Sequence, residues 1–403
     1  MRVAIITHSS TFETRAEAVG RFFADRGDDV TYVFSDFDHH AKATVHRSEP
    51  HHIYVHMRPF TRNLSVRRIA SISAFSRDAG TVLDDRMRSD APFDLLWFMI
   101  PANTLAPVAD RLHSAYGVPV VFDIIDLWPE SLPVSGIDWT PPIRRWRALR
   151  DSHLDCACAI FTECDRYRAV LGLPQDRTYT LYWYKANAPA AQPDAADEPE
   201  APADAAWRSP ARNPLHVAYL GAINNIIDIA LIRSLLAAMN ARHSVHLHII
   251  GRGERADEFV AAMRGAVADV TYHGAIYDEA TKNAILVQCA YGINIMKPQV
   301  TVGLSMKSID YLYCGLPLLN TIGGDTWRLV EDQGIGVNVD RGHIDDTADF
   351  AVSSALDAND AAGMHQSARD CYRELFTESR FRAVIDAALR ERLGEDGHAR
   401  HAD

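Results

Sequence analysis

The sequence lacks the long hydrophobic runs that membrane-spanning helices need. No segment reaches about 18 consecutive apolar residues, the length that marks a candidate helix across a bilayer. The apolar stretch after Met1, Val3 to Ile6, is also too short for the core of a signal peptide. We therefore expect a protein that does not cross a membrane.

Cysteine is scarce, and neither cysteine nor histidine follows a metal-binding spacing. The six cysteines include no Cys-x-x-Cys pair, and Cys156 and Cys158 lie on an apolar run, as buried reduced thiols do. The 18 histidines include the adjacent pairs His39-His40 and His51-His52, which are not pairs at the helical i, i+4 spacing. We predict a cytoplasmic protein without a metal site, with these histidines on a solvated surface.

Positive charge is in deficit. The 41 Lys and Arg residues face 53 Asp and Glu residues, which gives a net charge of -12. Nucleic acid is therefore not expected as a partner, because phosphate backbones favour basic surfaces.

Length and patterning indicate two domains. At 403 residues, 47% of them hydrophobic, the chain is too long for one compact core. In the first half, apolar runs of strand length alternate with helical patterns, at Val3 to Ile6, Val30 to Phe34, Leu95 to Ile100, Val118 to Phe122, Ala159 to Phe161 and Thr178 to Tyr182. The pattern restarts at Leu215 to Leu220, with later runs at Val245 to Ile250, Val270 to Tyr272, Tyr291 to Ile295, Leu316 to Leu319 and Gly336 to Val339. Such alternation is typical of parallel sheets covered by helices on both faces.

The composition also indicates the domain boundaries. We expect an N-terminal domain over 1–185, an Ala/Pro/acidic linker over 186–212, a C-terminal domain over 213–360, a terminal helical region over 361–392 and a flexible tail over 393–403. The predicted fold class is α/β, with two Rossmann-like, doubly wound domains facing an interdomain cleft. Ligands of such sheets bind beyond the carboxyl ends of the strands.

The stretch Gly303 to Pro317 carries the clearest chemistry. A helix beginning near Ser305 offers free backbone N–H groups and a positive dipole end, which suit a diphosphate, and Lys307 adds a full charge there. Asp310 falls one turn deeper on the same helix face, where a carboxylate can accept hydrogen bonds from ribose hydroxyls. These residues predict a nucleotide-diphosphate site.

Two glycine turns are further candidates for the donor site. Gly251-Arg-Gly follows a predicted strand and opens a helix, so that Arg252 can clamp a phosphate. Gly323 and Gly324 form another strand-to-helix turn that can donate backbone N–H groups to a phosphate or sugar. In both places an ordinary structural glycine turn is an equally good interpretation.

Acidic residues of the first domain are candidates for catalysis. Asp123, Asp126 and Glu130 lie at and just beyond the end of the predicted strand Val118 to Phe122. Of the two aspartates we favour Asp126 as the acid that accepts a proton from an acceptor hydroxyl or positions the transferred sugar. Asp123 can instead cap the strand, and Glu130 can instead begin a helix after Pro129.

The acceptor side is predicted from polar residues that follow other strands. The loop Thr7 to Arg15 joins the first strand to the first helix and supplies His8, Glu13 and Arg15, while Asn103 follows the strand Leu95 to Ile100. We expect these side chains to contact the acceptor. Thr11 as a helix N-cap is the alternative interpretation for the loop, and both can hold.

Two motifs resemble family-4 glycosyltransferases of the GT-B fold, in particular a subset that assembles polysaccharides. The donor-helix pattern Ser-x-Lys-x-x-Asp/Glu-Tyr with Gly-x-Pro downstream is matched by Ser305, Lys307, Asp310, Tyr311, Gly315 and Pro317, followed by Gly323 and Gly324. The segment Phe122 to Ser131 resembles the Asp-Leu-Trp-Pro-Glu-Ser segment of the same group. The resemblance covers nearly the whole chain in its order of elements.

The resemblance implies a glycosyltransferase whose donor is UDP-sugar or another nucleoside-diphosphate sugar. It implies that Asp310 binds the donor ribose, that the anomeric configuration is retained, that the leaving phosphate helps to deprotonate the acceptor and that no divalent cation is required. Two positions depart from the family pattern: Val302 stands where the first glutamate of an E-x7-E motif is expected, and Asn224-Asn225 stand where many members carry a basic pair. Lys307 and Arg252 are then the expected phosphate neutralisers.

Arginine clusters suggest a membrane-associated acceptor. One cluster comprises Arg62, Arg67, Arg68, Arg77, Arg86 and Arg88, beside Val66, Ile69, Ile72 and Phe75, and another comprises Arg144, Arg145, Arg147 and Arg150 near Trp146. Basic helices with apolar residues dock on anionic headgroups. We expect a glycan or polyprenyl-diphosphate-linked acceptor and peripheral contact with the inner face of the cell membrane, with ordinary solvated arginines as the alternative. A sugar-nucleotide epimerase and a non-catalytic nucleotide-sugar-binding protein are the competing functions.

Overall fold

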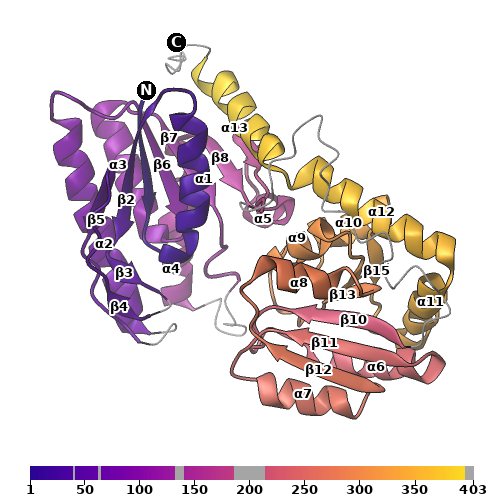
Figure 1. Ribbon diagram of the computed structural model, residues 1–403. Helices are drawn as coiled ribbons and strands as arrows, with labels where there is room; N and C mark the ends of the chain where they lie inside the picture. The colour runs from indigo at the N-terminus through magenta and orange to yellow at the C-terminus, as the bar shows by residue number, and fades with distance from the viewer. Residues whose placement is uncertain (40, 62–64, 132–139, 186–213, 395–403) are drawn as a thin grey trace. The chain divides into compact units, whose positions relative to one another are not determined.

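The computed structural model describes residues 1–39, 41–61, 65–131, 140–185 and 214–394 (Figure 1). The expected linker over 186–212 and nearly all of the expected tail over 393–403 lie outside the described residues. The chain forms two compact units, one of Met1–Tyr182 with Phe381–Asp403 and the other of Trp183–Arg380. No helix of the described part is long and apolar enough to span a bilayer.

The first unit is built on a seven-stranded parallel sheet of order β5-β2-β1-β6-β7-β8-β9. Its strands are β1 (Arg2–Thr7), β2 (Asp29–Ser35), β5 (His52–Val55), β6 (Leu95–Ile100), β7 (Val120–Ile124), β8 (Ala157–Thr162) and β9 (Thr178–Thr180). Every residue of β6 is buried, because helices cover both faces of the sheet. The order reverses between β1 and β6, and this switch point is where such sheets bind ligands.

The helices of the first unit connect these strands, except for α13 at the C-terminal end of the chain (Figure 1). They are α1 (Glu13–Ala24), α2 (Val66–Met87), α3 (Ala106–Tyr116), α4 (Pro141–Asp151), α5 (Asp165–Leu171) and the terminal α13 (Glu378–Leu393). A short hairpin of β3 (Phe37–Asp38) and β4 (Ala43–Thr44) and the 3-10 turns Ser10–Phe12, Asn103–Leu105, Leu154–Cys156 and Gln175–Arg177 complete it.

The second unit has a six-stranded parallel sheet of order β12-β11-β10-β13-β14-β15. The strands are β10 (Leu215–Leu220), β11 (Val245–Ile250), β12 (Asp269–Gly274), β13 (Tyr291–Asn294), β14 (Leu318–Asn320) and β15 (Gly336–Asn338). Numbered within the unit this is the 3-2-1-4-5-6 order of the Rossmann fold, with the switch point between β10 and β13. The predicted doubly wound α/β class is confirmed for both units.

The helices of the second unit are α6 (Ile229–Arg242), α7 (Ala256–Arg264), α8 (Glu279–Leu286), α9 (Met306–Tyr313), α10 (Asp325–Gln333), α11 (Ile344–Leu356) and α12 (Ala358–Leu375). The region 361–392, expected as one terminal segment, contains parts of two helices that belong to different units. The helix α12 packs on α9, and the His365 imidazole bonds the Gly315 carbonyl at 2.7 Å. The helix α13 joins the first unit, where Arg382 pairs with Asp25.

Candidate active site

Lys307 lies where the second sheet reverses its strand order. The helix α9 begins after Ser305, whose Oγ accepts a hydrogen bond from the Ser308 amide as an N-cap. The Lys307 side chain runs beside Gly221, which follows β10, and its ammonium lies 4.8 Å from the ring centroid of Tyr219. The helix start predicted near Ser305 is confirmed.

The Lys307 ammonium is buried without a counter-ion among the described residues. The residue is only 8% exposed, and no carboxylate among the residues that the structure describes pairs with it. Burial lowers the pKa of Lys307 to about 7. A buried cation without a partner at a switch point is a candidate for binding an anion.

The N-terminus of a second helix is tied to the same loop. Thr326, in the first turn of α10, donates to the Gly303 carbonyl through its amide at 3.0 Å and through its Oγ1 at 2.8 Å. Gly324 caps α10 at φ 78°, a conformation that suits glycine, so the turn at Gly323 and Gly324 brings this helix start back to Gly303. The start of α10 is therefore bonded to the segment that leads into α9.

A ladder of asparagines fixes the start of α9, and the sequence patterns did not predict it. Asn294, Asn320 and Asn338 end three neighbouring strands in register, joined by side-chain bonds of 2.9 and 2.8 Å. The Oγ of Ser305 donates to Oδ1 of Asn294 at 2.8 Å. The signal in the sequence was an asparagine at the end of each apolar run.

Asp310 lies in a network of opposite charges. Its Oδ1 pairs with Lys185 at 2.9 Å and Lys282 at 3.3 Å, and both lysines also pair with Glu279. Although burial favours the neutral amine, Asp310 and Glu279 together raise the pKa of Lys185. Asp310 is therefore held by two lysines one turn from Lys307, with 26% of its side chain exposed.

The glycines on either side of Arg252 are required by the close packing of two loops. A Cβ on Gly251 would stand 2.0 Å from the Gly221 carbonyl oxygen, and one on Gly253 would stand 2.1 Å from that of Ile223. The loops after β10 and β11 thus pack backbone against backbone, which only glycine permits. Arg252 itself is exposed, 5.8 Å from the ring centroid of Tyr277.

In the first unit, the strand that carries Asp123 extends further than the sequence indicated. The strand β7 continues to Ile124, so Asp123 lies within it and is fully buried. Arg15 binds Asp123 through two hydrogen bonds of 2.9 and 2.8 Å and also donates to the Leu181 carbonyl. With its side chain buried in this pair, Arg15 has no exposed surface to offer an acceptor.

Asp126 follows β7 and is held by its own loop. Its two oxygens accept hydrogen bonds from Nε1 of Trp128 at 2.7 Å and Oγ of Ser131 at 2.6 Å. Burial raises the pKa of Asp126, while these bonds and the charge of Arg68 act in the opposite direction.

Glu130 and Asn103 support the loop around Trp128. Glu130 pairs with the buried Arg150 and with Arg147, and these contacts outweigh burial and lower its pKa. Asn103, 1% exposed, donates to the carbonyls of Trp128 and Trp146. The contacts of Glu130 and Asn103 hold in place the loop that carries Asp126.

His8 belongs to a buried cluster that the sequence revealed only in part. Its ring makes edge contacts with Trp128 and His39 at centroid distances of 6.0 and 5.7 Å. The Arg68 guanidinium, assigned from sequence to a basic surface, lies 4.3 Å from the Trp128 ring centroid and is half-buried. Burial, with His39 and Arg68 adding to it, holds the pKa of His8 well below its usual value. Glu13 lies in the same loop and pairs with Arg47 at 2.8 Å.

Known proteins resemble the whole chain in structure. The Anabaena protein HepE, solved with UDP and glucose, is 13% identical over 96% of this chain and 99% of its own, with a TM-score of 0.63. Sucrose-phosphate synthase from Thermosynechococcus elongatus is 14% identical over 97% and 98% of the two chains, with a TM-score of 0.68. A glycosyltransferase from Rickettsia africae is 9% identical over 97% and 98%, with a TM-score of 0.61. The chain has the GT-B fold.

The second unit of this GT-B protein also matches a sequence family. Residues 215–356 match the family described as glycosyl transferases group 1. This segment runs from β10 to the end of α11 and includes Lys307, Asp310 and both glycine turns. No curated protein matches the sequence significantly. The match places the buried cation and both helix starts within the domain shared by those transferases.

Proposed function

We propose that this protein is a glycosyltransferase that moves a sugar from a nucleoside-diphosphate sugar to a glycan or lipid-linked acceptor. The observation that carries this proposal is the buried Lys307 ammonium beside Gly221, which is paired with no carboxylate of the described residues. The family match of residues 215–356 supports the reaction class.

The diphosphate would occupy the anion site of the second unit. Free amides at the starts of α9 and α10 and the charge of Lys307 would neutralise the leaving nucleoside diphosphate, so the reaction would need no bound cation. An arriving diphosphate would raise the pKa of Lys307 by supplying the counter-charge that no described carboxylate provides.

The ribose would bind one turn further along α9. The described contacts of Asp310 both use Oδ1, which leaves Oδ2 to accept a hydrogen bond from a ribose hydroxyl. Lys185 and Lys282 hold the carboxylate of Asp310 in place. Val302 cannot bond a sugar hydroxyl, so the donor sugar would be recognised elsewhere, and Lys297, Gln299 and the Gly323-Gly324 turn are our candidates.

The acceptor would bind the first unit beside His8 and Asp126. In the transfer, the acceptor oxygen bonds to the anomeric carbon while the bond from that carbon to the phosphate oxygen breaks. We propose that the leaving phosphate takes the acceptor's proton and that the configuration is retained. Asp126, with its raised pKa, would position the acceptor or the transferred sugar. Assigning the product's anomeric linkage by NMR tests retention, and an inverted linkage would rule it out.

Hexosyl transfer in polysaccharide assembly is the more specific proposal. It draws on the sequence resemblance and on neighbours of the same fold, among them Anabaena HepE solved with UDP-glucose. The same reasoning proposes a cytoplasmic enzyme that meets a polyprenyl-diphosphate-linked acceptor at the membrane surface.

A thermal-shift screen against sugar nucleotides tests donor binding. We expect one nucleotide to raise the Tm of the wild type selectively and Lys307→Met to abolish that rise, since ligand binding stabilises only the folded state. Arg264→Met is the matched control, because it removes an exposed positive charge at the end of α7 in the same unit. An undiminished shift in Lys307→Met would contradict the assignment.

Transfer itself needs a separate assay. Incubation of the purified protein with the selected donor, with and without candidate acceptors, should give product only when an acceptor is present. Epimerised nucleotide sugar formed without an acceptor would instead identify an epimerase, and binding without any turnover would identify a non-catalytic protein.

A further inference from the structure

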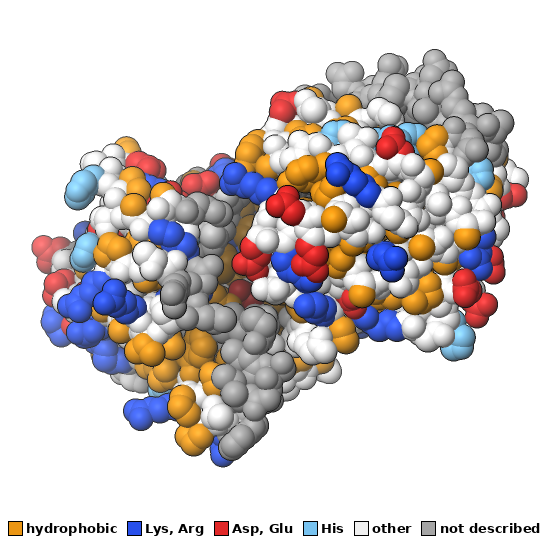
Figure 2. All heavy atoms as spheres, turned by 90° about the horizontal axis from the view of Figure 1, so that it is seen from below, with side chains coloured by type: hydrophobic (Ala, Val, Ile, Leu, Met, Phe, Trp, Pro, Cys, Tyr) orange, Lys and Arg blue, Asp and Glu red, His pale blue; other side chains and the backbone are white. Residues whose placement is uncertain are grey.

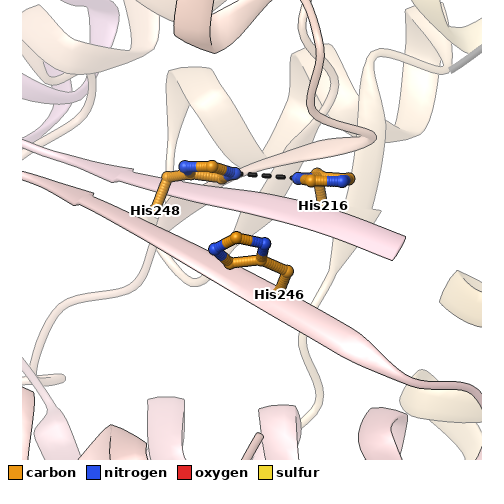
Figure 3. Close-up of side chains that lie close together, drawn as sticks. All are labelled: His216, His246 and His248. Carbon is orange, nitrogen blue, oxygen red and sulfur yellow. Dashed lines mark hydrogen bonds between the residues drawn. The ribbon is translucent and has the colours of Figure 1, made fainter. Parts of the chain in front are cut away.

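Four histidines lie side by side on three neighbouring strands of the second unit. His216 is on β10, His246 and His248 are on β11, and His273 is on β12. His216 and His246 are register partners, and His246 and His248 are two residues apart, so they project from the same face of the sheet. Figure 3 shows His216, His246 and His248 brought together across the two strands.

The nitrogens of three of these rings are close enough to share an ion. One ring nitrogen from each of His216, His246 and His248 lies within 4.8 Å of the others. Nδ1 of His216 and Nε2 of His248 are 2.8 Å apart in a hydrogen bond, drawn as a dashed line in Figure 3. All three side chains are half-buried, so water and ions can reach them.

His248 has a hydrogen-bond partner on each of the two neighbouring strands. Nδ1 of His248 also bonds Nε2 of His273 at 3.1 Å, the kind of outer contact that orients a metal-bound histidine.

We propose that His216, His246 and His248 bind a divalent transition-metal ion of the Zn²⁺ type. Such ions take imidazole nitrogens at about 2.0–2.1 Å in a tetrahedron whose fourth position can hold water. The ion would replace the hydrogen bond between His216 and His248. His246 would turn its ring, which is now stacked on His248 at a centroid distance of 4.3 Å, so that one nitrogen faces the ion.

This site is separate from the proposed donor site. His216 precedes Leu220, at the carboxyl end of β10, by four residues, or about 13 Å along a strand. An ion there would contact neither Lys307 nor its diphosphate. It would link β10 to β11, and through His273 to β12, and so stabilise the edge of the sheet rather than take part in transfer.

Calorimetric titration of the tag-free, metal-stripped full-length protein with Zn²⁺ tests the site. We expect about one equivalent to bind, and His216→Gln and His248→Gln each to weaken binding at least tenfold. His343→Gln is the matched control, since His343 is an exposed histidine of the same unit bonded to Asp340. The His343→Gln variant should bind Zn²⁺ with the affinity of the wild type.

Two further measurements keep the test decisive if a variant folds poorly. His246→Asn removes the third proposed ligand and leaves the hydrogen bond between His216 and His248 intact. Circular dichroism in EDTA checks that each variant is folded. Co²⁺ added to the wild type should give the intense visible bands of a tetrahedral site. Zn²⁺ should raise the Tm of the wild type and of His343→Gln, but not that of the His216 and His248 variants. No saturable binding to the wild type, or equal binding by the His216 and His248 variants, would overturn the proposal.

Discussion

Ser305 Oγ donates a 2.8 Å hydrogen bond to Asn294 Oδ1, which fixes the first residue before α9 to the last residue of β13. Both side chains are buried, and Asn294 is in turn bonded to Asn320. The orientation of the α9 amides, and of Lys307 behind them, thus depends on a contact between two side chains that need not touch any ligand.

Asn294→Ala should loosen this contact. Loss of buried hydrogen-bond partners costs about 1–3 kcal/mol of unfolding free energy, and we expect the affinity for the donor nucleotide to fall as well. Chemical denaturation and calorimetric titration measure the two effects. Asn338→Ala, at the half-buried far end of the ladder, should cost less stability and leave donor affinity near the wild-type value. Equal donor affinity in both variants would argue against a positioning role for Asn294.

Lys307 should make the free protein less stable at neutral pH than at alkaline pH. Its folded pKa, about 7, lies below the value of about 10.4 for an unfolded lysine, so the unfolded chain binds the extra proton between these values. The contribution of Lys307 to stability therefore rises with pH across that window. Lys307→Met should have the higher Tm near pH 7 and show a flatter pH dependence in thermal denaturation scans from pH 7 to 9. Parallel curves for the two proteins would contradict this expectation.

The buried pair of Arg15 and Asp123 should be sensitive to the loss of either charge. Arg15→Met leaves the Asp123 carboxylate buried without its partner, and such a change typically costs about 3–5 kcal/mol. The double variant Arg15→Met/Asp123→Leu should recover much of that loss, because no unpaired charge remains. Urea denaturation of the single and double variants measures the difference, and additive losses would contradict the pairing.

The start of α2 is the surface on which the proposed membrane contact can be tested. Val66 and Ile69 are 83% and 46% exposed beside the exposed Arg67, and Figure 2 shows Lys and Arg side chains next to hydrophobic ones on the first unit. Arg62 of this cluster lies outside the described residues. We expect the wild type to float with vesicles containing anionic lipid and Val66→Glu/Ile69→Glu to remain unbound. Val170→Glu, at an exposed valine elsewhere on the unit, is the control, and absence of lipid-dependent flotation of the wild type would remove the membrane claim.

Local patterns sufficed for the start of α9 and for the strands of both sheets except β5, which was not predicted. The apolar runs placed most strands within one or two residues, and the serine before Lys307 marked the N-cap because capping depends on neighbours in sequence. A shift of two residues in β7, however, moved Asp123 from the strand end into the interior, where it meets Arg15, 108 positions away. Pairings over such distances leave no local pattern.

The histidine cluster of the second sheet could not be predicted from the sequence for a different reason. A search for metal ligands at the helical i, i+4 spacing passes over His246 and His248, whose spacing of two residues puts them on one face only if the segment is a strand. The third ligand, His216, is recognisable only from the register of β10 and β11. The pairing of Asp310 with lysines was not predicted for a similar reason. Lys185 is 125 positions away in the sequence, and only the fold brings it to Asp310.

The pKa of Lys307 has one more consequence, for the heat of donor binding. With a pKa of about 7, a sizeable fraction of the free protein carries a neutral amine at physiological pH, whereas a diphosphate bound at the proposed site would favour the ammonium. Donor binding as proposed would therefore take up a fraction of a proton from solution. We expect the apparent binding enthalpy to vary with the ionisation heat of the buffer and the affinity to weaken as the solution becomes alkaline, which would couple donor binding to the surrounding proton concentration.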